Sequence, residues 1–94
     1  MSMTKIFSIY DSKGEIYAQP FFQRNVNVAI RTFTNMVNDE RSQISSYPED
    51  YTLFEIGMWD DVKGIIITHK TALSVGKGID FQKKEGQLNM LDKQ

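Results

Sequence analysis

The 94-residue chain contains no cysteine and only one histidine, His69. Without cysteine, neither a disulfide framework nor a thiolate zinc site can form. The histidine has no nucleophile motif beside it, and neither Ser8 nor Ser74 stands in the pattern of a nucleophile elbow. The carboxylate pairs at residues 49–50 and 60–61 lie in turn-like segments, where solvated turn chemistry is the common reason for them. We therefore expect a protein that is not an enzyme and that uses no metal or other cofactor.

Long apolar runs are also absent. No stretch approaches the roughly 20 residues of a membrane span, and the N-terminus lacks the apolar core of a signal peptide. We expect a soluble intracellular protein with no membrane partner. The length suits one domain, which we place at residues 1–82, and the polar, glycine-containing residues 83–94 predict a flexible tail.

The net charge of −1 gives no general support for nucleic-acid binding. The charges are nevertheless unevenly distributed. Acidic residues dominate residues 39–61, where Arg41 is the only base, and lysines outnumber acids from residue 62 onward. This asymmetry indicates an acidic end and a basic end of the surface, with ordinary solvated charge as the alternative.

Two strand pairs are expected from residue type and turn chemistry. Residues 5–10 (KIFSIY) are rich in β-branched and aromatic residues, and the turn at residues 11–14 leads into a second strand at residues 15–18 that Pro20 ends. The alternating residues 51–59 form the third strand. Residues 60–64 form a turn with Gly64 at positive φ, and residues 65–67 form the fourth strand. Beyond His69 the pattern predicts at most a short extended piece at residues 72–75.

One amphipathic helix lies between the two hairpins. Asn25 is a good N-cap residue, and apolar residues then recur at helical spacing over residues 26–38. The polar residues 39–50 form a long connector. We therefore predict an α+β fold, with two β-hairpins that form a four-stranded, mainly antiparallel sheet and one helix packed on one face. The expected core consists of Ile6 or Phe7, Ile9, Val26, Ala29, Ile30, Phe33, Val37, Leu53 or Phe54, Ile56 and Ile66.

A small sheet with exposed aromatics and scattered bases can bind single strands by stacking and by charge. The stacking candidates are Tyr10, Tyr17 and Trp59, and the phosphate-binding candidates are Arg24, Arg31, Lys63, Lys70 and Lys77. Aromatic residues in strands more often pack in a core or on a sheet face, so that alternative stays open. The sequence contains no RNA-recognition signature of the glycine-aromatic kind.

An ordered series of short motifs carries a family resemblance. The motifs are FSIYD at residues 7–11, AIR-x-F at 29–33, VND at 37–39, YPEDY-x-L at 47–53 and G-x-WD at 57–60 leading to Gly64. In this order, over roughly residues 5–78, the chain resembles the small non-structural protein of gokushovirus-type microviruses, which are single-stranded-DNA phages.

The resemblance implies a phage accessory protein that is made in the cytoplasm of the infected bacterium and is absent from the capsid. It implies binding to single-stranded DNA, or to replication or packaging proteins, during viral genome synthesis. Arg31 is the best single candidate within these motifs. A homo-oligomer is a further expectation, because the second strand is a candidate sheet edge. The alternative is a protein-interaction module that engages phage or host factors without contacting DNA, which the acidic residues 39–61 favour.

Overall fold

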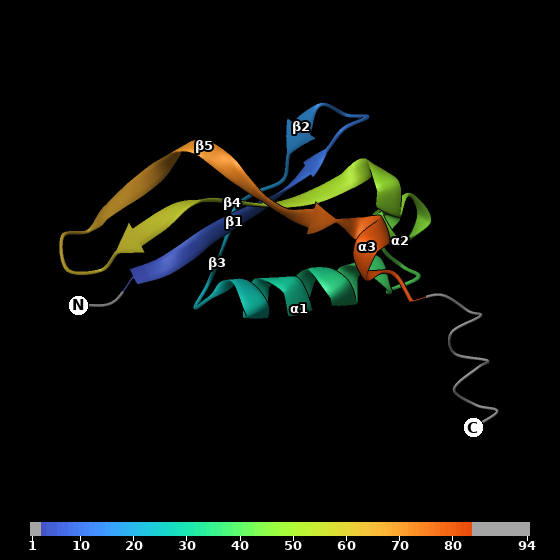
Figure 1. The fold of residues 1–94 in the computed structure, drawn as a ribbon, viewed down its shortest axis with the longest axis horizontal. Coiled ribbons are helices and arrows are strands. Elements are labelled where there is room, and N and C mark those ends of the chain that lie inside the picture. Colours follow the sequence, from blue (N-terminus) through green and yellow to red (C-terminus); the bar gives the residue numbers. More distant parts are fainter. Residues whose placement is uncertain (1–2, 84–94) are drawn as a thin grey trace, which may run out of the picture.

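The computed structural model describes residues 3–83 as a curled antiparallel sheet with helices on one side (Figure 1). The strands are β1 (Met3–Asp11), β2 (Ile16–Tyr17), β3 (Phe21–Gln23), β4 (Tyr51–Asp60) and β5 (Ile65–Lys77). The helices are α1 (Val26–Val37), α2 (Gln43–Ser46) and α3 (Gly78–Phe81), with a 3-10 turn, η1 (Pro48–Asp50). The predicted α+β class is confirmed, but the predicted counts of four strands and one helix are wrong.

The sheet is built around the antiparallel pair of β1 and β4. Its order is β2-β1-β4-β5, and β3 also pairs with β1. The two predicted hairpins, β1–β2 and β4–β5, are therefore present. The additional strand is β3, whose Phe21 lies opposite Phe7. Pro20 has no N–H to give to a ladder, so it interrupts this edge, but the chain resumes pairing directly after it.

Strand β5 is much longer than predicted because it continues through an irregularity. Thr68 lies opposite Gly57 and Leu73 lies opposite Glu55, so residues 69–72 stand against Ile56 alone. We call residues 69–72 the β5 arch. Extra residues on one strand bend it and increase its twist. This arch divides the β4–β5 hairpin into a near half (residues 51–55 and 73–77) and a far half (residues 57–60 and 65–68).

Helix α1 begins and ends as its sequence indicates. The side chain of Asn25 accepts a hydrogen bond from the Val28 N–H at 3.0 Å, and Asn38 closes the helix. Its apolar stripe packs on the near half of the sheet, and the buried cluster consists of Phe7, Ile9, Ala29, Phe33, Val37 and Leu53. Val26 and Ile30 are partly buried against this cluster. The stripe therefore supplies one side of the core, as predicted.

Two predicted core positions of the hairpin are wrong: Ile56 lies outside the buried cluster and lines a cavity, and Ile66 lies in the far half. Figure 1 shows this part of β4 and β5 reaching past the N-terminal end of α1. Ile66 lies there and is 56% exposed, so its assignment to the core is wrong. Ile66 is hydrophobic, but no helix of the described residues reaches it. The turn itself is as predicted, since Gly64 has a φ of +68° and its N–H donates to the Asp60 carbonyl at 2.9 Å.

The short helices gather at the C-terminal end of α1. The ring of Phe81 in α3 lies 5.9 Å from that of Phe33, and the Asn38 side chain donates to the Phe81 carbonyl at 3.1 Å. Gly78 permits the close approach to η1, because a Cβ there would stand 2.6 Å from the Pro48 carbonyl oxygen. Elements of three or four residues are too short to show a helical period, so the sequence pattern did not reveal them.

The predicted flexible tail lies outside the described residues, apart from Lys83. The N–H of that residue donates to the Asn38 side-chain oxygen at 2.8 Å, which fixes it beside the end of α1. Within residues 3–83, no helix combines the length and apolarity that crossing a bilayer requires.

Candidate nucleic-acid interface

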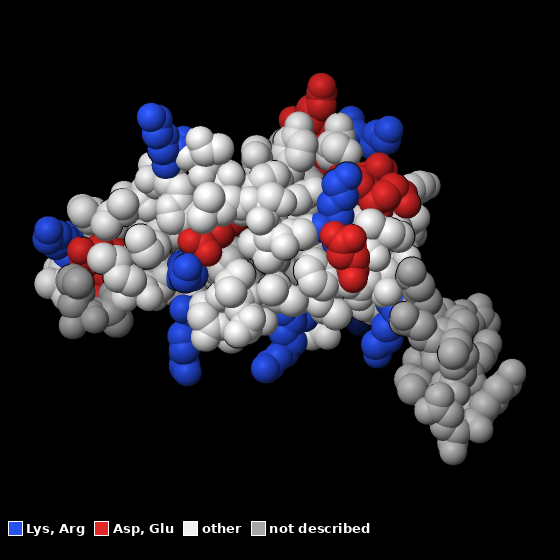
Figure 2. Space-filling model, viewed as in Figure 1, with Lys and Arg blue, Asp and Glu red and all other residues white. Residues whose placement is uncertain are grey.

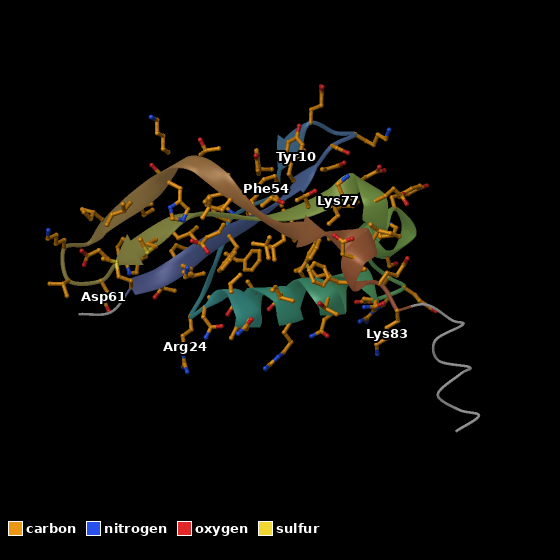
Figure 3. All side chains as sticks on the ribbon, in the orientation of Figure 1. Tyr10, Arg24, Phe54, Asp61, Lys77 and Lys83 are labelled. Carbon is orange, nitrogen blue, oxygen red and sulfur yellow. The ribbon has the colours of Figure 1, made fainter. Side chains whose placement is uncertain are left out.

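The sheet face opposite α1 carries an aromatic cluster that no described helix covers. Tyr10 alternates along β1 with core residues, so it points to this face, and it lies opposite Tyr17 of β2. The ring centroids of Tyr10 and Tyr17 are 4.6 Å apart, and that of Phe54 is 5.8 Å from Tyr17 and 6.4 Å from Tyr10. Figure 3 shows Tyr10 and Phe54 on the side of the sheet away from α1. We call these three residues the aromatic platform.

A lysine stands in the same row as the platform. Tyr10 pairs with Thr52, and Thr52 pairs with Lys77, so these side chains point to one face. Two strand spacings separate Tyr10 from Lys77, which is about 10 Å between their backbones. Lys77 is exposed, and Phe54 lies two residues beyond Thr52 along β4, so it points to the same face. A cation and three aromatic rings therefore share this surface.

A cavity of about 420 Å³ lies between the β5 arch and the β2 side of the sheet. Its lining is mainly apolar and consists of Ser8, Tyr17, Ala18, Pro20, Ile56, Thr68, His69 and Ala72. It exists because β5 departs from β4 at the arch. Its volume falls within the range of small-ligand sites. Tyr17 belongs both to this cavity and to the aromatic platform, so the two features form one continuous surface.

A charged network supports the arch from beneath. The buried Glu55 carboxylate accepts a hydrogen bond from Lys5 Nζ at 3.1 Å, and its other oxygen lies 2.7 Å from His69 Nε2. Burial raises the pKa of Glu55, but the hydrogen bonds from His69 and Lys5 and the charges of those two groups outweigh it, so the net pKa lies below the ordinary value. The network ties the arch to β4 and β1.

His69 thus has a carboxylate within hydrogen-bond reach, which is one part of an acid–base pair. The neighbouring hydroxyl does not complete a nucleophile, because Ser8 Oγ donates to the Ala18 carbonyl at 2.7 Å. The contacts of His69 and Ser8 are explained by a structural role, in which they hold neighbouring strands together. The expectation that the protein is not an enzyme stays a prediction.

The remaining β-sheet candidates are spread along the far half and the arch. Lys70 is an exposed residue of the arch, and Lys63 belongs to the β4–β5 turn. Trp59 lies near the far end of β4, where it lines a second cavity of about 370 Å³ with Thr4, Phe22 and Ile66. The structure therefore places Tyr17 and Lys77 in one row across the sheet, three strand spacings apart, whereas Trp59 lies near the other end of β4.

The two candidate arginines lie on the α1 side instead. Arg24 precedes the N-cap of α1, and Arg31 is exposed midway along it. Lys83 joins them at the other end of the helix through Asn38. In Figure 2, the charged side chains of the described residues that project along the lower edge, on the α1 side, are basic, whereas acidic and basic side chains are interspersed above. The candidate cations thus divide between the two sides of the molecule.

Two residues of these surfaces were missed in the sequence. The sequence favours Leu53 and Phe54 equally for the core. The strand register decides between them, because Phe54 pairs with Ser8 and Leu53 pairs with the core residue Ile9. Lys83 was assigned to the tail. Nothing local in the sequence signals its hydrogen bond to Asn38, which lies 45 residues away.

Residues 4–81 match the family model described as Phage ORF5 protein. The chain belongs to the Phage ORF5 protein family. The match takes in the aromatic platform, the arch and α1, and it confirms the predicted small phage protein. The narrower assignment to microviruses stays a prediction, as does the location in the host cytoplasm. No curated protein and no solved structure matches the chain.

Proposed function

We propose that this member of the Phage ORF5 protein family is a non-enzymatic accessory protein that binds single-stranded DNA, in the replication or packaging of the phage genome. One observation carries the proposal. The uncovered sheet face presents three adjacent aromatic rings next to an apolar cavity, Lys77 stands in the same row of the sheet, and Lys70 is an exposed residue of the arch that lines the cavity.

Stacking supplies most of the binding in this proposal. A base stacked on an aromatic side chain contributes about 1–3 kcal/mol and requires no particular base sequence. Tyr17 is 48% exposed, so its ring is accessible without a rearrangement of the sheet. The cavity next to it is large enough for a base turned away from its neighbours.

Phosphate contacts are few on this face, in keeping with the net charge of −1. We assign them to Lys70 and Lys77, because Arg24, Arg31 and Lys83 lie on the α1 side. Two contacts predict a shallow salt dependence, in which the logarithm of the affinity falls with the logarithm of salt with a slope of about −1.4.

Titration of a labelled, unstructured single-stranded oligonucleotide at two salt concentrations tests this proposal. Tyr17→Ala is expected to weaken binding by about 5- to 150-fold, the equivalent of one lost stacking contact. Tyr47→Ala is the matched control, because Tyr47 is also exposed, at 58%, but belongs to the connector and is not one of the three platform rings. Absence of binding at low salt, or equal losses in the two variants, would contradict the proposal.

A second candidate function is a protein-interaction module that engages phage or host factors without contacting DNA. The exposed apolar residues of the far half favour it, since large apolar patches mark interaction sites. A binding assay of this protein with purified, nuclease-treated phage replication or capsid proteins would test this candidate directly. If this protein binds one of them and shows no affinity for DNA, the second candidate is favoured over the first.

A further inference from the structure

The outer edge of β5 ends the sheet. In the sheet order β2-β1-β4-β5, no strand within residues 3–83 pairs with that side of β5. The far half of this edge is apolar, because Ile65, Ile66 and Ile67 follow one another and all three are exposed. A long hydrophobic edge strand is a template for pairing with another chain. The opposite edge is different, since β2 and β3 are two and three residues long and Pro20 interrupts them.

We propose that residues 65–67 pair antiparallel with the same residues of a second copy of the chain, around a two-fold axis at Ile66. The two sheets then join into one. This interface rests on the far half alone and does not depend on the proposed binding of DNA.

The side-chain rows across the sheet favour this centre. Ile66 pairs with Trp59, and Trp59 pairs with Thr4, so one apolar row with a hollow of about 370 Å³ ends at the edge. A two-fold axis at Ile66 continues this row directly into its copy. On the other face, Ile65 of each chain comes to lie opposite Ile67 of the other. Apolar side chains therefore meet across the edge on both faces, as stabilising cross-strand pairs require.

Charge argues against an alternative centre on the same strand. Strand β5 contains Lys70 and Lys77 and no acidic residue. An axis near Thr71 would bring the two copies of Lys70 together, whereas an axis at Ile66 keeps them apart. The turn that Lys70 of the other copy approaches carries Lys63 as well as Asp61, and Asp60 there is buried and accepts hydrogen bonds from the Val62 and Lys63 N–H groups, so charge adds no attraction at that point. The segment is thus complementary to itself in the placement of its apolar side chains.

A single introduced cysteine provides the sharpest test, because the chain has none of its own. Residues directly opposite in an antiparallel pair have Cα atoms about 4.5–5.5 Å apart, within the range that a disulfide spans. Ile66→Cys is therefore expected to form a covalent dimer rapidly under mild oxidation. Ile16→Cys is the control, since Ile16 is 63% exposed but lies on the opposite edge, and it is expected to cross-link only slowly.

Sedimentation over a concentration series provides the second measurement. The unmodified protein is expected to show a monomer–dimer equilibrium, and Ile66→Lys is expected to raise the dissociation constant at least about tenfold, while Ile16→Lys leaves it unchanged. Circular dichroism checks that both variants fold. A protein that stays monomeric throughout, or a dimer that survives Ile66→Lys, would overturn the interface. Either result leaves the proposed binding of DNA to be judged by its own titration.

Discussion

The near and far halves of the β4–β5 hairpin are made of the same two strands but differ in how their apolar side chains are buried. In the near half, Leu53 is fully buried beneath α1. In the far half, three consecutive isoleucines remain exposed. The residues of the far half are at least as hydrophobic, so composition does not explain the contrast. The length of α1 explains the contrast, because this 12-residue helix covers only the part of the sheet that lies beneath it.

The largest loss of folding stability is expected from a substitution in the apolar stripe of α1, which covers the near half. Phe33 is fully buried, so Phe33→Ala should reduce the free energy of unfolding by about 3–5 kcal/mol. A domain of this size has little stability to spare, so the variant should be partly unfolded at ambient temperature. Denaturant unfolding followed by circular dichroism measures the effect. A loss below about 1 kcal/mol would mean that α1 does not define the stable half.

This contrast also shows what the sequence could predict. Helix α1, its Asn25 cap and the Gly64 turn depend on short-range spacing and local hydrogen bonds, and each was predictable. The length of β5 was not, because the arch interrupts the alternation with polar residues. Whether an apolar residue such as Ile66 is buried depends on which distant element covers it, and local pattern carries no such information.

The candidate site divides in the same way. Tyr17 and Lys77 are candidates by residue type, and only Tyr17 belongs to a strand that the sequence predicts. Their association with Phe54, and their separation from Trp59, follow from the pairing register of strands far apart in the chain. The cavity depends on the arch and was therefore not predictable either.

An intermediate loss of folding stability is expected from a substitution of Glu55, which lies at the boundary between the halves and ties the arch to β1. The folded-state pKa of Glu55 lies below its ordinary value, which is about 4.3 in an unfolded chain. Its contribution to stability is therefore fully present above that pH and is lost as the pH falls through the folded-state pKa. Glu55→Gln should remove about 1–3 kcal/mol at neutral pH, because Lys5 and His69 lose a charged partner.

Unfolding measured between neutral and acidic pH checks this expectation. The difference in stability between the unmodified protein and Glu55→Gln should shrink as the pH is lowered. Glu49→Gln is the control, since Glu49 is exposed and should behave like the unmodified protein at every pH. A constant difference across the range would show that the network stabilises the arch by shape and not by the charge of Glu55.

The smallest effect on the fold is expected in the far half. Ile66→Thr keeps the β-branched shape that suits a strand and changes only exposed surface, so the free energy of unfolding of the monomer should change by no more than about 0.5 kcal/mol. Measurement at low protein concentration isolates the monomer. At high concentration the same variant should be less stable than the unmodified protein, because a dimer that forms only from folded chains adds to their stability by mass action. If Ile66→Thr is neutral in dilute protein and destabilising in concentrated protein, the two halves have different roles. The near half packs against α1 and stabilises the folded monomer, and the apolar far half stabilises the dimer.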